Sequence, residues 1–190
     1  MTRIHIFGAS GSGTTTLGEA LAKTLDIQHY DTDSYFWMPT DPPFQVVRER
    51  TDRLARMLHD LENSESWVLS GALCGWGDLL IPMFDLVVFL WIPSDLRMQR
   101  LRKREFERYG LDIDDPSDPR YEKHEEFLNW AAGYDSGPTS MRSRARHEAW
   151  MSALPCRVIR LAGDRTVQEN MNSVLAQLAD RSFHLFEEGE

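Results

Sequence analysis

The sequence contains little cysteine, no long hydrophobic run and no excess of basic residues. Its two cysteines, Cys74 and Cys156, are too few for a disulfide framework and are typical of a reducing compartment. No apolar stretch approaches the roughly 18 residues that a membrane-spanning helix needs, so no membrane partner is expected. Residues 1–6 read as a strand and lack the layout of a signal peptide. Together these absences predict a cytoplasmic protein.

Acidic residues outnumber basic ones, 30 to 21, which gives a formal net charge of −9. A chain of this charge is a poor candidate for binding a nucleic-acid backbone, so nucleic acid is an unlikely partner. The content of 42% hydrophobic and 27% charged residues excludes disordered and collagen-like classes. Arginines nevertheless gather within residues 97–108 and 142–146. Such clusters in an acidic chain indicate a small anionic ligand held at a defined site.

The apolar pattern alternates between strand and helix. The length of 190 residues suits a single domain, 1–190. Periodicity and apolar runs predict strands at 4–7, 27–30, 67–69, 86–92 and 157–161, and helices at 14–25, 47–61, 94–108 and 167–178. This α/β alternation predicts a parallel sheet covered by helices on both faces, with ligands bound beyond the carboxyl ends of the strands.

One segment, residues 109–138, departs from this rhythm. It is rich in Asp, Glu and Gly and has little apolar periodicity. We therefore expect an insertion, or lid, of low internal stability there.

A glycine-rich loop follows the first predicted strand and opens the first helix. Residues 8–15 read GASGSGTT, and Gly8, Gly13 and Thr15 match the phosphate-loop template G-x-x-x-x-G-K-S/T. Glycines let backbone N–H groups curl inward, and the helix N-terminus adds partial positive charge. Thr15 is spaced to give its hydroxyl to a magnesium ion. The residues expected to contact a nucleotide are Gly8, Ser10, Gly11, Ser12, Gly13, Thr14, Thr15 and Thr16.

The lysine of that template is absent, and Thr14 stands in its place. The lysine ammonium normally reaches the β- and γ-phosphates, whereas a threonine hydroxyl is neutral. Either another cation substitutes, or phosphate is bound without fast transfer.

Residues 5–13 (HIFGASGSG) and 31–37 (DTDSYFW) carry a resemblance to the nucleoside monophosphate kinase superfamily. Within it they resemble proteins labelled adenylate kinase-related or DNA topology modulation protein. The resemblance implies a three-layer α/β/α sandwich with a five-stranded parallel sheet. It further implies ATP as the phosphoryl donor, Mg²⁺, and a helical lid that closes over the phosphates. The missing lysine is a departure from most of the superfamily.

Asp31 and Asp33 follow the second predicted strand, and alternation places both side chains on one side of an extended chain. Carboxylates near bound phosphates can hold magnesium or accept a proton from a substrate hydroxyl. The pair resembles the Asp-x-Asp of shikimate kinases, which implies a magnesium role for Asp31 and a catalytic role toward the acceptor hydroxyl for Asp33. A helix cap or a simple loop acid is the alternative.

Arg100 and Arg104 lie four residues apart, on one face of the predicted helix 94–108. The resemblance implies that they are lid arginines on the nucleotide and the transferred group, and so candidates to replace the lysine. Their neighbours Arg97, Arg102 and Arg108 are expected to be solvated or paired with Glu105 and Glu107. Arg142 and Arg146 are expected to share a helical face, and they either approach from the far side of the lid or lie exposed.

These features predict an ATP-dependent phosphotransferase that moves the γ-phosphoryl group of Mg-ATP to a small acceptor. The alternative is a nucleotide-binding regulatory or sensor protein with little catalysis, because Thr14 replaces the lysine. The acceptor is not identified by the sequence, and the chain is expected to act as a monomer or a homodimer.

Overall fold

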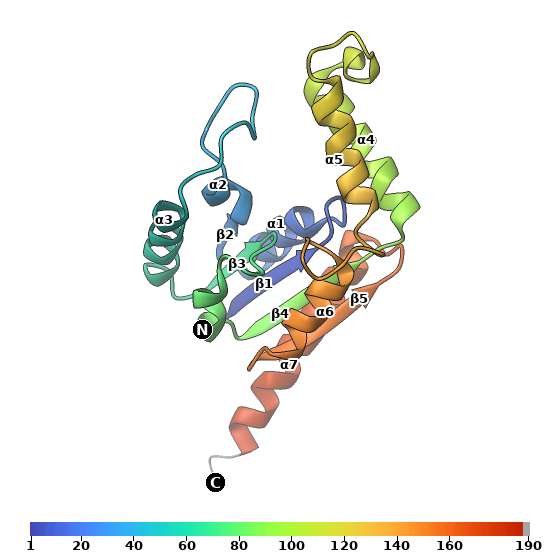
Figure 1. Ribbon diagram of the computed structural model, residues 1–190. Helices are drawn as coiled ribbons and strands as arrows, with labels where there is room; N and C mark the ends of the chain where they lie inside the picture. The colour runs from blue at the N-terminus through green and yellow to red at the C-terminus, as the bar shows by residue number, and fades with distance from the viewer. Residues whose placement is uncertain (188–190) are drawn as a thin grey trace.

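Five parallel strands form one sheet in the computed structural model, in the order β2–β3–β1–β4–β5 (Figure 1). The structure describes the backbone of residues 1–187, and the side chains of these residues except 111–112 and 181–187. The strands are β1 (Arg3–Gly8), β2 (Gln28–Asp31), β3 (Trp67–Ser70), β4 (Leu86–Trp91) and β5 (Arg157–Ala162). The predicted five-stranded parallel sheet is confirmed.

Seven α-helices and two 3₁₀ helices occur in the described chain. The α-helices are α1 (Thr14–Leu25), α2 (Thr32–Phe36), α3 (Arg50–Glu62), α4 (Ser94–Tyr109), α5 (Tyr121–Ala132), α6 (Arg144–Ser152) and α7 (Val167–Glu187). The 3₁₀ helices are η1 (Asp78–Met83) and η2 (Leu111–Asp114). α3 begins at Arg50, later than the predicted 47, because the Glu49 carboxylate accepts hydrogen bonds from the backbone N–H groups of Thr51 and Asp52 and caps the helix.

The two faces of the sheet carry separate hydrophobic clusters. On one face, Ile4 and Ile6 of β1 pack with α1 and with Val174 of α7. On the other face, Phe7 packs with residues of α3, η1 and α6, including Leu80. Figure 1 shows helices on both sides of the sheet, and this arrangement confirms the expected three-layer sandwich. No helix in the described part of the chain is long and apolar enough to cross a membrane.

α4 and α5 pair to form an arm that rises above the sheet (Figure 1). Their contact is apolar, because Leu101 of α4 is buried with Leu128 and Ala131 of α5. The expectation of a solvated Arg97 is wrong: its side chain is fully buried, and its guanidinium donates to Asp135 at 2.5 Å and to the carbonyl of Ala131 at 3.2 Å. This ion pair and the bond to Ala131 join α4 to the end of α5 and the residues after it, at the base of the arm.

Two histidines lie inside the aromatic cluster of the second face. His5 of β1 stacks between Phe7 and Phe84 with ring centroids 5.5 and 5.0 Å away, and its Nδ1–H donates to the carbonyl of Leu69. Burial lowers the pKa of His5 to about 4 and that of His147 to about 3. Both imidazoles are therefore neutral in the folded protein at neutral pH.

Because these two pKa values lie below the ordinary 6.5, we expect stability to fall as the pH drops from 6.5 toward 4. In that pH range the two histidines bind protons in the unfolded chain but stay neutral in the folded protein. Each histidine then costs about 1.4 kcal/mol per pH unit. Urea unfolding at pH 7, 6 and 5 checks this: His5→Leu should flatten the pH dependence, and the same change at exposed His59 should not. An unchanged slope in His5→Leu would contradict the assignment.

Candidate active site

The glycine loop connects β1 to α1 and opens onto a cavity. Gly11 and Gly13 have φ values of 78° and 91°, a backbone region that favours glycine. A side chain at Gly8 would lie 2.4 Å from the carbonyl oxygen of Leu90, so the loop also needs glycine there for packing. Ser10, Gly11, Thr14 and Thr15 line the cavity. Ser12 is buried, and its hydroxyl has no hydrogen-bond partner in the described part of the chain, whereas Thr16 is exposed.

The cavity has a volume of about 710 Å³ and lies between the glycine loop, α2, the segment after β3, the arm and α6. Its size falls in the usual range for small-molecule sites. Aromatic side chains and arginines form most of its outer wall: Phe36, Trp37, Phe44, Trp76, Arg104, Arg108, Phe127, Trp130, Arg142 and Arg146.

Asp31 links the glycine loop to the ends of two neighbouring strands. Its Oδ2 accepts hydrogen bonds from the Thr15 hydroxyl at 2.7 Å and from the Ser70 hydroxyl at 3.2 Å. The register pairs Asp31 directly with Ser70, so both strands end at this point. Its Oδ1 accepts from the backbone N–H of Asp33 and caps α2. Asp31 thus acts as the helix cap that the sequence left open, while its second oxygen stays at the glycine loop.

The described residues contain no group of three acidic, histidine or cysteine side chains able to hold a metal by themselves. Thr15 and Asp31 instead offer two oxygens at the mouth of the phosphate loop. Magnesium is commonly held by one or two protein oxygens together with substrate phosphates and water. The donor set therefore fits a magnesium ion that arrives with a nucleotide.

Asp33 stands in the first turn of α2 and faces the cavity. The surrounding walls remove solvent and raise the pKa of this carboxyl, and the neighbouring Asp31 raises it further. Arg142, Arg104 and Arg108 oppose this rise in that order. Asp33 is consequently a carboxylate of increased basicity, surrounded by guanidinium groups.

The two arginines proposed from α4 point to different places. Arg104 lines the cavity, 6.0 Å from the ring centroid of Phe127, and is joined by Arg108. The buried Glu105 accepts from both, at 3.3 and 3.4 Å. Arg100 is instead paired with Asp164 at 3.2 Å on the outer surface and is not part of the cavity wall. The spacing of four predicted a common face, but the long side chains diverge from it.

Arg142 contacts the glycine loop itself. Its Nη2 donates to the carbonyl of Gly8 at 2.7 Å, and its guanidinium lies 5.8 Å from the ring of Trp130. Arg142 precedes α6, which begins at Arg144, so the shared helical face expected for Arg142 and Arg146 is wrong. Arg146 donates from Nε to the sulfur of Cys74. The local density of arginine is the one signal in the sequence that points to this part of the site.

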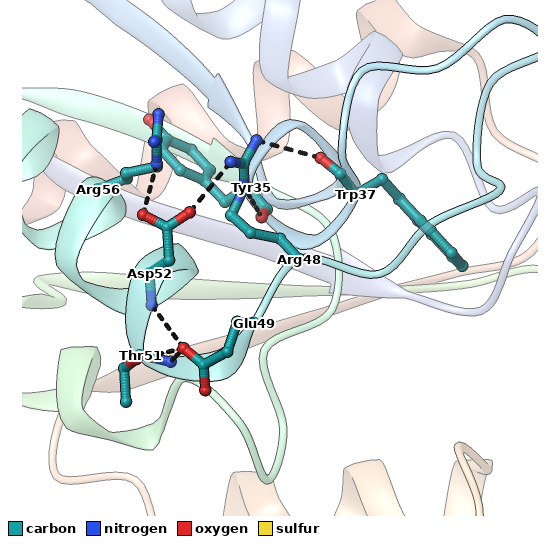
Figure 2. Close-up of polar contacts among 7 residues, drawn as sticks. All are labelled: Tyr35, Trp37, Arg48, Glu49, Thr51, Asp52 and Arg56. Atoms are coloured by element: carbon teal, nitrogen blue, oxygen red, sulfur yellow. Dashed lines mark hydrogen bonds and ion pairs between the residues drawn. The ribbon is translucent and has the colours of Figure 1, made fainter.

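A hairpin-like loop between α2 and α3 forms the outer wall opposite the arm. Arg48 fixes its base: the guanidinium donates to the carbonyls of Tyr35 and Trp37 and pairs with Asp52 of α3 at 3.2 Å (Figure 2). At its tip the loop touches the arm. Phe44 lies 4.6 Å from the Arg108 guanidinium, and Gln45 accepts from Lys123 of α5 at 2.8 Å.

The sheet order and the glycine loop after the central strand define a P-loop protein of the nucleoside monophosphate kinase-like superfamily. A family model described as AAA domain matches residues 4–126, and the chain belongs to this family.

Three similar proteins illustrate the relationship. The chain is 49% identical over 176 residues to a protein of Bacillus subtilis (strain 168) described as uncharacterized protein YqaC, covering 93% of this chain and 97% of that protein. It is 31% identical over 115 residues to a shikimate kinase of Caldicellulosiruptor bescii, covering 54% and 65%. The crystal structure of a gluconokinase from Sinorhizobium meliloti 1021 superposes with a TM-score of 0.56 at 17% identity, covering 100% and 98%. That last likeness concerns the fold.

Proposed function

We propose that the protein is a P-loop kinase that transfers the γ-phosphoryl group of Mg-ATP to a small acceptor. The observation that carries the proposal is that Asp33 and the glycine loop line the same cavity. A donor phosphate held by the loop and an acceptor beside Asp33 would meet in a space partly closed to water. The similarity to a shikimate kinase supports the same reaction class.

The loop residues from Gly8 to Thr16 would hold the β-phosphate through backbone N–H groups and the N-terminus of α1. Thr15 and Asp31 would orient a magnesium ion, whose charge would help to neutralise the phosphates. The hydrogen bond between these two side chains supports this pairing.

Asp33 would accept the proton of an acceptor hydroxyl, and Arg104 would stabilise charge on the transferred group. The raised pKa of Asp33 supports a role as base. An acceptor phosphate would need no base, and Asp33 would then only position it. Arg100 would act as a second catalytic arginine of the lid after the arm closes and the ion pair between Arg100 and Asp164 breaks.

We also propose that residues 109–138 act as a lid on a single domain, 1–190. The contacts of Gln45 with Lys123 and of Phe44 with Arg108 support this proposal, because they join the arm to the opposite wall of the cavity. The two free thiols, Cys74 and Cys156, are in keeping with a reducing cytoplasm.

A nucleotide-binding sensor with little turnover is the second candidate. It is favoured by one observation, the neutral Thr14 at the lysine position on the cavity wall. Such a protein would bind Mg-ATP and release no ADP with any acceptor.

The first test is ADP release from Mg-ATP by the purified protein, against a panel of nucleoside monophosphates, nucleosides and small hydroxylated metabolites. We expect a rate that depends on one class of acceptor, because the cavity positions only a matching group beside Asp33. Nucleotide binding without any acceptor-dependent rate would favour the sensor.

Asp33→Asn should abolish most turnover while nucleotide binding persists. A positioned base contributes on the order of 10²–10⁴-fold, and asparagine keeps the shape without accepting a proton. Because the pKa of Asp33 is raised, kcat/KM should fall with decreasing pH at a higher pH than for an ordinary aspartate. Arg108→Gln removes a charge that lowers this pKa and should move the acid limb upward. Retained turnover in Asp33→Asn would remove Asp33 from the mechanism.

Arg104→Ala should lower turnover far more than nucleotide affinity, by roughly 10²-fold, if its guanidinium acts on the transition state. Arg102→Ala on the same helix is the matched control, since Arg102 is exposed and outside the cavity wall. Steady-state kinetics and nucleotide titration of both variants measure the split. Equal losses in kcat and affinity would argue against a transition-state role.

A further inference from the structure

The phosphate loop lacks a cation at the position where its template places lysine. Thr14 opens α1 and faces the cavity with a neutral hydroxyl. Phosphoryl transfer increases the charge on the oxygen that bridges the β- and γ-phosphorus atoms, and a fixed positive group stabilises that charge. A kinase with this loop therefore needs a cation from elsewhere in the fold.

Several cations in the cavity wall are engaged by partners away from the loop. Arg104 and Arg108 share the carboxylate of Glu105, and Lys123 donates to Gln45. Arg146 contacts the sulfur of Cys74. Their hydrogen bonds and ion pairs therefore lie within the arm, between the arm and the loop that joins α2 to α3, or between α6 and Cys74.

Arg142 differs from them in three ways. Its Nη2 is anchored on the carbonyl of Gly8, the first residue of the loop, at 2.7 Å. Its Nε is buried and has no hydrogen-bond partner among the residues that the structure describes. Arg142 and Asp33 also interact electrostatically, and Arg142 is the first of three arginines that favour the ionised carboxyl. The Arg142 guanidinium thus contacts the glycine loop, which would hold the phosphoryl donor, and interacts with Asp33, beside which the phosphoryl acceptor would bind.

The Arg142 side chain is half-buried, and its buried Nε–H favours an anionic partner, because a charged group without its full set of hydrogen-bond acceptors is unfavourable away from water. Phosphate oxygens match the planar donor array of arginine. The Gly8 carbonyl fixes one end of the group beside the loop, which leaves the remaining donors for a bound nucleotide.

We propose that Arg142 is the catalytic cation that replaces the missing P-loop lysine, with its guanidinium on the β- and γ-phosphates of ATP. This inference rests on the proposed kinase function. In the step, an acceptor oxygen bonds to the γ-phosphorus while the bond from that phosphorus to the bridging oxygen breaks. The electron pair of the broken bond stays on ADP, the acceptor proton goes to Asp33, and Arg142 stabilises the bridging oxygen.

The test is a rescue experiment with four proteins: wild type, Arg142→Ala, Thr14→Lys and the double variant. Arg142→Ala should lower kcat by on the order of 10²–10³-fold. Thr14→Lys in that background should recover at least about tenfold, because it restores a cation to the same phosphates. The Thr14→Lys single variant supplies the reference kcat with which the double variant is compared. Arg146→Ala, four residues further along the chain, is the control. If it lowers kcat, adding Thr14→Lys should not restore kcat.

A binding measurement separates failure of this assignment from failure of the kinase proposal. Arg142→Ala should weaken the binding of ATP and ADP by about tenfold and leave the affinity for AMP unchanged. Adding Thr14→Lys to that variant should restore the affinity for ATP and ADP. Restored binding without transfer in any variant would overturn the kinase function and leave the phosphate role of Arg142 standing. No restoration in either measurement, or an equal loss of AMP binding, would overturn the assignment.

Two further measurements guard against a damaged fold or loop. Thermal unfolding of each variant identifies loss of structure, and Arg142→Gln then replaces Arg142→Ala. If Thr14→Lys alone abolishes ATP binding, rescue is measured by adding guanidine to the arginine-deleted variant. Saturable recovery of ATP binding supports the role, and no recovery overturns it.

Discussion

The parallel register of β1, β2 and β3 is the constraint on which the site depends. β3 pairs with both neighbours, so Asp31 lies opposite Ser70 and β1 ends in the glycine loop at the same edge. Hydrogen bonds of a parallel sheet fix this alignment residue by residue, and the apolar cores on both faces prevent a slip. The bond between Thr15 and Asp31 is a direct consequence, since it joins two segments that only the sheet brings together.

The outer wall is built on different physics. Arginines and aromatic side chains form it, and three of the arginines are held by specific partners: the buried carboxylate of Glu105 for Arg104 and Arg108, and the Gly8 carbonyl for Arg142. The protein is acidic overall, yet five arginines and one lysine line its cavity with three carboxylates, those of Asp31, Asp33 and Glu105. This separation of charge gives an acidic chain a local positive potential that suits an anionic ligand.

The arm shows where sequence patterns were least informative. Residues 109–138 have weak apolar periodicity, and yet α5 forms there, because Leu128 and Ala131 need only a narrow stripe to pack on Leu101. Arg97 was the clearest error. A charged residue in a charged helix is usually solvated, but this one is buried by the arm and paired with Asp135 from beyond it. No local pattern indicates a partner 38 residues away.

The sequence by itself determined the strand and helix alternation, the parallel sheet and the phosphate loop, because those depend on local periodicity and on glycine geometry. It also brought forward Asp31 and Asp33, since both follow a strand end directly. Only the tertiary structure decided which arginines face the cavity. A long side chain follows its hydrogen-bond partner rather than its helical face, so Arg100 turns to Asp164 while Arg142 reaches Gly8, 134 residues earlier in the chain.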